Sequence, residues 1–512
     1  MQKKEFNNNV LYLIIISLVL LLGLVLRTIV WVKSSILWGD EANILMPVVD
    51  KSFLNLLLTN FDYSGEQAPP LFLMSAKVLY KIFGINDIGL RLFSYLSSVA
   101  ALFAFFFLTK KVFKNKTTIL VSNFIFATNM SLLLMTDLLK PYISDVLICI
   151  LIMLFCINNI NTNFTFKKII KISIVCFLFC LLSFPSLFLI LCCFLMFLFK
   201  NIYEKNKENY PQLALFSFLM FCFFIIYNQT VLFKLRSDTY LIEQWKETYG
   251  YFPNSQFEIS SLVSYLFNSA EYFAPAELIL TIVFCTLLAL GVIKIIHKYI
   301  QDRNVEEKYT TTLLIAPIIF GLTLGALSVY PFANRLVEYL LPCLIYVLAI
   351  PFENNHIKNN LIKNFVTIGL LCLLITYISF SRIPEMTKDI LSGINVFEFP
   401  RATILFEEIN REKKPDDIIY PDPFLQFYIY NKKYKIPEEQ CIYNYGPYYM
   451  GVDYNDIIDK IKNKKTIWFV LVTMEEQDNP EVYKNLSVWI NENCSKQTTK
   501  EVDWYKLVKC EK

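Results

Sequence analysis

Charged residues and glycine are scarce in this chain. Only 18% of its 512 residues are Asp, Glu, Lys or Arg, and it has 13 glycines and two histidines. So little charge beside 55% hydrophobic residues excludes an ordinary soluble protein. The sequence also lacks a glycine-rich phosphate loop and a clustered basic stripe, and its net charge is only +4, so nucleic acid is not an expected partner.

The chain has long apolar segments instead. They lie near residues 10–32, 87–109, 117–136, 142–158, 169–184, 186–200, 211–229, 276–296, 310–329, 336–352 and 364–381. Most approach the roughly 17 to 25 residues that a helix needs to cross a bilayer, so the sequence predicts about eleven membrane crossings. The first segment shows no small-residue cleavage site and is expected to stay as an anchor.

Lys and Arg fall mainly in alternate loops. Examples are Lys110 to Lys116, Lys167 to Lys171 and Lys294 to Lys308. Because basic loops stay in the cytoplasm, the pattern predicts a cytoplasmic amino terminus. An odd number of crossings then places the carboxyl-terminal tail outside, on the same face as the first loop.

The predicted organisation is a membrane domain over 1–381 and a soluble α/β domain over 382–512. The first outer loop, 33–86, carries two short amphipathic helices; the second begins at Pro69-Pro70, ends at Gly84 and has Lys77 and Lys81 on its polar side. A second large outer loop covers 232–275. The tail alternates helices near 400–412, 453–463 and 481–492 with strands at 418–420, 466–472 and 502–508. Its three cysteines, Cys441, Cys494 and Cys510, permit one disulfide but require none.

Adjacent carboxylates, Asp40 and Glu41, begin the first outer loop. One interpretation is purely structural: Asp40 caps a helix and Glu41 interacts with its dipole. However, other charged side chains cluster at outer ends of predicted crossings, where charge is costly and usually serves a site or a paired partner. These are Asp137, Lys140, Asp145 and Arg335.

Several short motifs occur in order along the membrane part. They are Trp38-Gly39-Asp40-Glu41, Ala68-Pro69-Pro70-Leu71-Phe72-Leu73, Lys140-Pro141-Tyr142 with Asp145, and Tyr330-Pro331-Phe332 followed by Arg335 and Pro342. In this arrangement the chain resembles the polytopic GT-C glycosyltransferases. It is most similar to bacterial glycosyltransferase family 39, which is protein O-mannosyltransferase-like, and to the aminoarabinose transferases of lipid A. The resemblance implies an α-helical polytopic protein in the bacterial plasma membrane.

The resemblance also implies an inverting transfer of a sugar from a polyprenyl phosphate to an acceptor hydroxyl on the extracytoplasmic face. Asp40 would be the base, and Glu41 would orient it or bind the acceptor. Lys140 and Arg335, with Arg236 as a weaker third, would bind the donor phosphate. Alternatively, Lys140 extends to the interface and Arg335 pairs with Glu338 or a headgroup. Further expected substrate-binding residues are Glu66, Gln67, Asp137, Tyr142 and Asp145; Asp137 and Asp145 equally fit structural pairing.

No cofactor is expected. Both histidines, His297 and His356, fall in predicted inner loops, so they are not available to an outer metal site. Asp40 and Glu66 would form at most an oxygen-only site for a divalent ion, and we predict no required metal. The acceptor stays open between lipid, polysaccharide and protein. Two other functions also stay open: a transporter or flippase of a lipid-linked saccharide, and a non-catalytic membrane assembly protein.

Overall fold

The computed structural model describes residues 2–32, 37, 39–58, 68–233, 278–301, 305–332, 334–353, 402–421, 430–442, 454–472, 480–502 and 505–512. The predicted segment 364–381 lies outside these ranges, as do Glu66, Gln67, Arg236 and most of the second outer loop. Asp40 is described in its backbone only.

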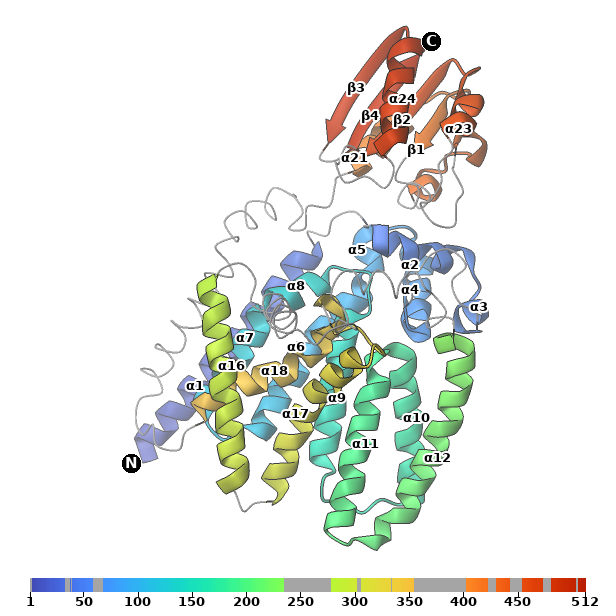
Figure 1. The fold of residues 1–512 in the computed structure, drawn as a ribbon. Coiled ribbons are helices and arrows are strands. Elements are labelled where there is room, and N and C mark those ends of the chain that lie inside the picture. The colour runs from blue at the N-terminus through green and yellow to red at the C-terminus, as the bar shows by residue number, and fades with distance from the viewer. Residues whose placement is uncertain are drawn as a thin grey trace.

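Figure 1 shows a bundle of long helices with a small sheet domain at one end. The helices of the bundle are α1 (Gln2–Val32), α6 (Leu92–Val112), α7 (Lys116–Thr128), α8 (Met130–Thr136), α9 (Tyr142–Asn158), α10 (Phe166–Leu182), α11 (Pro185–Tyr203), α12 (Tyr210–Tyr227), α16 (Leu278–Gln301), α17 (Val305–Ala326), η3 (Asn334–Leu340) and α18 (Leu341–Ala349). Two one-turn segments, η1 (Lys207–Asn209) and η4 (Ile350–Phe352), and the π-helical η2 (Asn228–Leu232) flank α12 and α18. They match the predicted apolar segments that fall in the described part of the chain.

Seven described helical spans are long and apolar enough to cross a membrane, and α7 with α8 makes an eighth if that bent pair is one span. The α9 helix is apolar but shorter. The prediction of a polytopic helical membrane protein is therefore confirmed. Its count of about eleven crossings is not, and it stays a prediction.

The bend between α7 and α8 is held by a charged side chain from α1. Arg27 is fully buried, and its guanidinium donates to the carbonyl oxygens of Ala127 (3.0 Å), Phe126 (3.3 Å) and Gly23 (3.0 Å). Its Nε donates to Ser98 Oγ at 2.9 Å. Carbonyls at the end of a helix lack partners within the helix, and the macrodipole makes that end negative. Arg27 thus satisfies the end of α7 and fixes the 47° bend that leads into α8.

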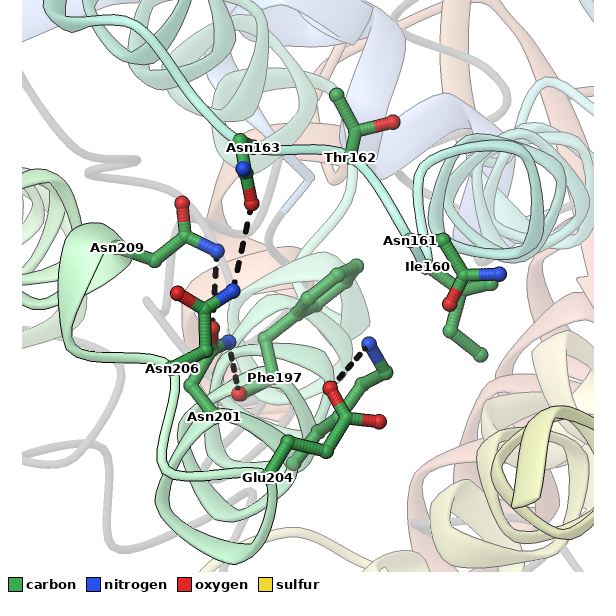
Figure 2. A pocket seen from close by; sticks show the side chains of 10 residues that line it. Ile160, Asn161, Thr162, Asn163, Phe197, Asn201, Glu204, Asn206 and Asn209 are labelled. Atoms are coloured by element: carbon green, nitrogen blue, oxygen red, sulfur yellow. Dashed lines mark hydrogen bonds and ion pairs between the residues drawn. The ribbon is translucent and has the colours of Figure 1, made fainter.

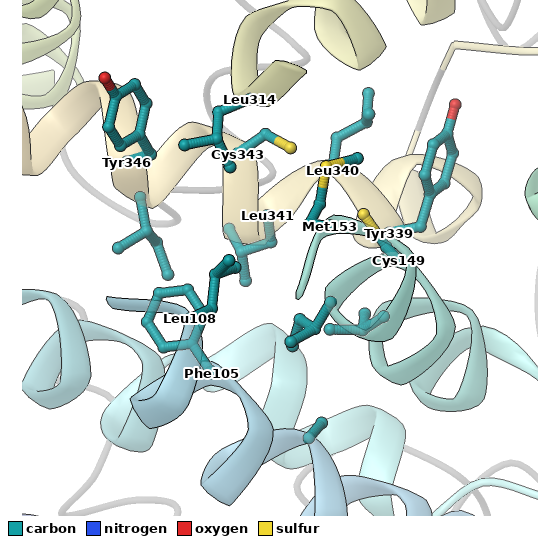
Figure 3. Packing of buried hydrophobic residues seen from close by; sticks show 14 of the residues in the cluster. Phe105, Leu108, Cys149, Met153, Leu314, Tyr339, Leu340, Leu341, Cys343 and Tyr346 are labelled. Carbon is teal, nitrogen blue, oxygen red and sulfur yellow. The ribbon is translucent and has the colours of Figure 1, made fainter. Parts of the chain in front are cut away.

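The centre of the bundle is a dry apolar core shared by α6, α9, η3 and α18. Figure 3 shows Phe105 and Leu108 of α6 packed near Leu341 and Tyr346, with Cys149 of α9 beside Cys343 of α18. All six of these side chains are buried. This packing holds η3 against α9, close to the outer end of the bundle.

The segment 39–90, which includes most of the predicted first outer loop, forms a compact unit in its described residues. It contains α2 (Gly39–Asp50), α3 (Phe53–Leu58), α4 (Pro70–Phe83) and the one-turn α5 (Asp87–Leu90). The predicted boundaries of α4 are confirmed: Pro70 begins it, and Gly84 ends it at φ +65°, a conformation that favours glycine. Lys77 corrects an expectation, since it is buried and donates to the Val49 carbonyl at 3.2 Å instead of facing solvent.

The carboxyl-terminal part forms a four-stranded sheet in the order β1-β2-β4-β3. Its strands are β1 (Ile418–Pro421), β2 (Thr466–Val472), β3 (Lys496–Val502) and β4 (Tyr505–Glu511), and its helices are α21 (Ala402–Glu412), the single-turn η5 (Glu438–Gln440), α23 (Tyr454–Ile461) and α24 (Pro480–Asn493). The first two strands are parallel and the others antiparallel. The predicted α/β arrangement is confirmed, but β3 was missed: it is polar and mostly exposed at the sheet edge, so it carries no apolar alternation.

Cys494 and Cys510 form a disulfide that joins the end of α24 to β4 across a sequence separation of 16. We expect replacement of both by Ser to lower the free energy of unfolding of the sheet domain by about 3 kcal/mol, because the crosslink limits the unfolded chain. Hydrogen exchange of the β4 amides in the full chain measures this. Cys441→Ser is the control, since Cys441 is not part of this crosslink. Unchanged exchange in the double variant would contradict the expectation.

Candidate functional site

Glu41 and Arg91 form a buried ion pair at the end of the bundle where α6 begins. Arg91 Nε lies 2.9 Å from Glu41 Oε1, and Arg91 Nη2 lies 2.6 Å from Oε2. Glu41 is fully buried and Arg91 is 1% exposed. Burial alone would lower the pKa of Arg91, but the carboxylates of Glu41 and Asp137 raise it, so the guanidinium stays charged. This two-pronged geometry is among the strongest that a carboxylate can make with a side chain.

Local structure explains how the pair meets. Asn86 caps α5 by accepting the Gly89 amide at 2.8 Å, and Arg91 is the joint between the short α5 and the long α6. Its side chain therefore leaves the start of a membrane helix. Glu41 lies in the first turn of α2, so a negative charge there also interacts favourably with the helix dipole.

The same pair fixes the turn between α8 and α9. The Leu139 amide donates to Glu41 Oε1 at 2.5 Å, and Asp137 Oδ1 lies 3.5 Å from Arg91 Nη1. From α6, Ser94 Oγ donates to the Leu138 carbonyl at 2.6 Å. The predicted substrate residue Asp137 is thus part of an ion-pair network, and the predicted catalytic residue Glu41 holds α2, α6 and the 137–141 turn together. Glu41 is fully buried within this network, and its predicted role in orienting Asp40 or binding the acceptor stays a prediction.

The predicted phosphate-binding residues lie next along this turn. Lys140 is 4% exposed. Two residues later, Tyr142 begins α9, and the Arg335 guanidinium lies 5.6 Å from the centroid of its ring. Arg335 comes from η3 and is half-buried. The structure therefore brings Lys140, Tyr142 and Arg335 into one neighbourhood. Glu338, the alternative partner of Arg335, is buried and accepts a hydrogen bond from Ser131.

Asp145 lies in the first turn of α9, three residues after Tyr142. It is 6% exposed and lies beside Ser183, at the break between α10 and α11. Its Oδ1 makes no hydrogen bond to the described residues. A buried carboxyl oxygen without a partner is costly. This favours a polar ligand group or water at Asp145, and its predicted role in substrate binding stays a prediction.

Asp40 is the second residue of α2, so its backbone lies at the helix start, directly before the Glu41 that pairs with Arg91. Its side chain lies outside the described part of the chain, as do Glu66, Gln67 and Arg236. Their predicted roles remain predictions. No group of three or more His, Cys, Asp or Glu among the described residues is arranged to hold a metal ion.

A polar cavity of about 200 Å³ lies at the other end of α9, away from these residues. Figure 2 shows its wall of asparagine side chains from the α9–α10 and α11–α12 connections. Asn209 donates to Asn201 at 2.9 Å, Asn206 donates to Asn163 at 3.3 Å, and Lys200 pairs with Glu204 at 2.9 Å. These groups bind one another, so the cavity wall joins two loops and is not the candidate site.

Arg91 is the residue that sequence reasoning missed. It was visible as a charge near the start of the predicted 87–109 crossing, and a charge at that depth usually has a partner. What the sequence did not reveal was the identity of the partner. Glu41 is 50 positions earlier, in a segment whose fold is set by tertiary packing.

Two solved structures share this fold over nearly the whole chain. ArnT from Cupriavidus metallidurans bound to undecaprenyl phosphate matches with a TM-score of 0.56 and 11% identity, covering 96% of this chain and 97% of that one. The same protein in the apo state matches with a TM-score of 0.55 and 10% identity, covering 99% and 98%. At 10 to 11% identity this likeness shows a shared fold, in agreement with the fold that the resemblance implied. No protein-family model matches the sequence, and no curated protein matches it.

The ion pair makes a clear prediction for stability. Glu41→Met removes the two-pronged partner of the buried Arg91 and leaves the Asp137 carboxylate at 3.5 Å, so we expect it to destabilise the protein by about 3 to 5 kcal/mol. Combining it with Arg91→Met removes both charges, and the double variant should recover part of that loss. Thermal unfolding of the purified protein in detergent measures all three variants. A double variant as unstable as the sum of the single variants would contradict the coupling.

Proposed function

We propose that this chain, with its GT-C fold, is an inverting glycosyltransferase. It moves a sugar from a polyprenyl phosphate to an acceptor hydroxyl on the extracytoplasmic face of the membrane. The observation that carries the proposal is the likeness to ArnT over 96% of the chain, in a structure that holds undecaprenyl phosphate. The charged residues gathered at the outer end of the bundle support it.

In the proposed reaction the acceptor oxygen attacks the anomeric carbon from the face opposite the phosphate. The carbon–oxygen bond to the phosphate breaks, and the polyprenyl phosphate leaves with the bonding electrons, so the configuration at the carbon inverts. The Asp40 carboxylate takes the acceptor proton. Its backbone lies at the start of α2, where the helix dipole interacts favourably with negative charge, and Glu41 holds that helix start in place.

Charge grows on the leaving phosphate as its bond to the sugar breaks, and cations nearby stabilise that charge. Lys140 and Arg335 are the proposed cations among the described residues. Lys140 follows the turn clamped by Glu41, and Arg335 stacks over Tyr142. Side chains already held in position lose little freedom on binding, so they are suited to a phosphate. Arg236 is proposed as a third cation, and Glu66 and Gln67 as contacts to the acceptor or lipid phosphate.

Two observations support an extracytoplasmic site. The sheet domain contacts the first outer loop, where Lys433 Nζ lies 3.4 Å from Asp87 Oδ2. The sheet domain and the candidate site therefore share one face of the membrane. That domain also contains the Cys494–Cys510 disulfide, and disulfides persist in oxidising compartments. The acceptor is proposed only as a hydroxyl group, and no metal is required in the proposed reaction.

The base assignment is tested by Asp40→Asn, which keeps the shape of the side chain and removes its basicity. We expect turnover with a polyprenyl-phosphate sugar to fall at least 100-fold, within the range of about 10²- to 10⁴-fold typical of a lost general base. Purified protein in lipid nanodiscs and a radiolabelled donor provide the assay. Glu208→Gln is the matched control, because Glu208 is an exposed carboxylate at the far end of the bundle. Full turnover by Asp40→Asn would refute the assignment.

The phosphate assignment is tested separately with Arg335→Gln and Lys140→Gln. Each removes one charged hydrogen-bond donor, so we expect the KM for the lipid-linked donor to rise about 10-fold to 100-fold. Arg411→Gln is the control, because Arg411 lies on an exposed face of α21 in the sheet domain. Initial rates at varied donor and saturating acceptor give the KM. An unchanged donor KM in both variants would exclude these side chains from the phosphate site.

A further inference from the structure

The sheet domain reaches the candidate site through one side chain. Tyr430 lies on a helical turn at 430–434, and its hydroxyl makes two hydrogen bonds to the first outer loop. It accepts from the Leu37 amide at 3.1 Å and donates to Asp87 Oδ1 at 3.0 Å. Leu37 is three residues before Asp40, and Asp87 is one helical turn before Arg91. The hydroxyl therefore bridges the segment that leads to Asp40 and Glu41 and the segment that leads to Arg91.

This bridge is shielded from water. Tyr430 and Leu37 are both fully buried. Burial raises the pKa of the Tyr430 phenol well above its ordinary value, so the hydroxyl keeps its proton and donates to Asp87. An amide left without a partner in such a place would cost free energy, because water does not reach it to replace the lost bond. The backbone at Leu37 is therefore held by the phenol.

The position of the hydroxyl is set by the core of the sheet domain. The Tyr430 ring stacks on Phe406 of α21, with ring centroids 5.4 Å apart, and both side chains belong to the apolar cluster between α21 and the sheet. Two lysines beside Tyr430 extend the contact. Lys433 pairs with Asp87 at 3.4 Å, and Lys432 pairs with Asp50 at the end of α2. The sheet domain thus holds the chain before α2 and also the end of α2.

We propose that the sheet domain is part of the transferase machinery and that Tyr430 is its positioning residue. Tyr430 fixes the chain before Asp40 while Arg91 fixes Glu41 directly after it, so the base is held from both sides. Tyr430 touches no reacting atom and acts through the backbone at Leu37. This inference rests on the proposed function, because it assigns the purpose of the contact to the orientation of Asp40.

The test compares Tyr430→Phe with Tyr434→Phe in the full-length protein. Tyr430→Phe keeps the ring on Phe406 and removes only the bridging oxygen. Tyr434→Phe removes the hydroxyl of a tyrosine four residues further along the same short helix. The Tyr434 oxygen lies 3.5 Å from Glu407 of the sheet domain. For Tyr430→Phe we expect kcat to fall about 10-fold, with the donor KM within twofold of the native protein. For Tyr434→Phe we expect native kinetics.

Hydrogen exchange provides a second measurement that needs no activity. The Leu37 amide should exchange at least 10-fold faster in Tyr430→Phe, and at the native rate in Tyr434→Phe. Faster exchange together with a lower kcat supports the inference. Faster exchange with a native kcat overturns the positioning role, and native exchange overturns the contact itself. An equal loss of kcat in both variants also overturns it, since the effect would then belong to the domain in general. If the native protein transfers no sugar, the proposed function fails, whereas the exchange result still decides the contact.

Discussion

The buried pair of Glu41 and Arg91 joins three parts of the molecule that are far apart in sequence. Glu41 belongs to the first outer loop, Arg91 to the start of a membrane helix, and the Leu139 amide to the turn before α9. Two opposite charges without water are stable only when each remaining hydrogen-bonding atom also finds a partner. Here the Glu41 carboxylate also accepts the Leu139 amide, and the Arg91 guanidinium also donates to Asp137. That requirement fixes the relative position of the three segments more strictly than apolar packing would.

The candidate site is built from two supports around this pair. On one side, the turn after α8 leads to Lys140 and Tyr142, over which Arg335 stacks from η3. On the other side, α2 presents Asp40 at its start, with the sheet domain holding Leu37 just before it. Positive charge thus comes from the bundle, and the acidic pair comes from the outer loop. The proposed transfer requires this separation of roles, since its base and its cations would act on opposite sides of the anomeric carbon.

Local signals in the sequence were sufficient for the elements and not for their contacts. Pro70 and Gly84 set the ends of α4, and apolar runs of helical length predicted the bundle, because these features depend on near neighbours only. Lys77 was misread for the opposite reason: its ammonium group is used by the Val49 carbonyl, which the amphipathic pattern of α4 does not reveal. Likewise the tail cysteines allowed several outcomes, and only the fold of β4 against α24 selects Cys494 and Cys510.

The site itself was predictable as a cluster of charge at crossing ends, but its internal organisation was not. The sequence shows Asp40 and Glu41 only as adjacent carboxylates. The structure distinguishes them, because Arg91 pairs with Glu41. The contribution of the sheet domain was equally hidden. Tyr430 is one of 30 tyrosines in the chain, and its hydroxyl finds Leu37 across 393 positions of sequence.

Arg27 has a consequence for how the protein is assembled in the membrane. Its guanidinium donates hydrogen bonds to the carbonyls of Phe126 and Ala127, which are synthesised 99 and 100 residues later. Until α7 arrives, the first helix carries an uncompensated charge in hydrocarbon, a state that favours remaining at the translocon or near the headgroups. We therefore expect the amino-terminal helix to reach its final position only after α7 has been synthesised.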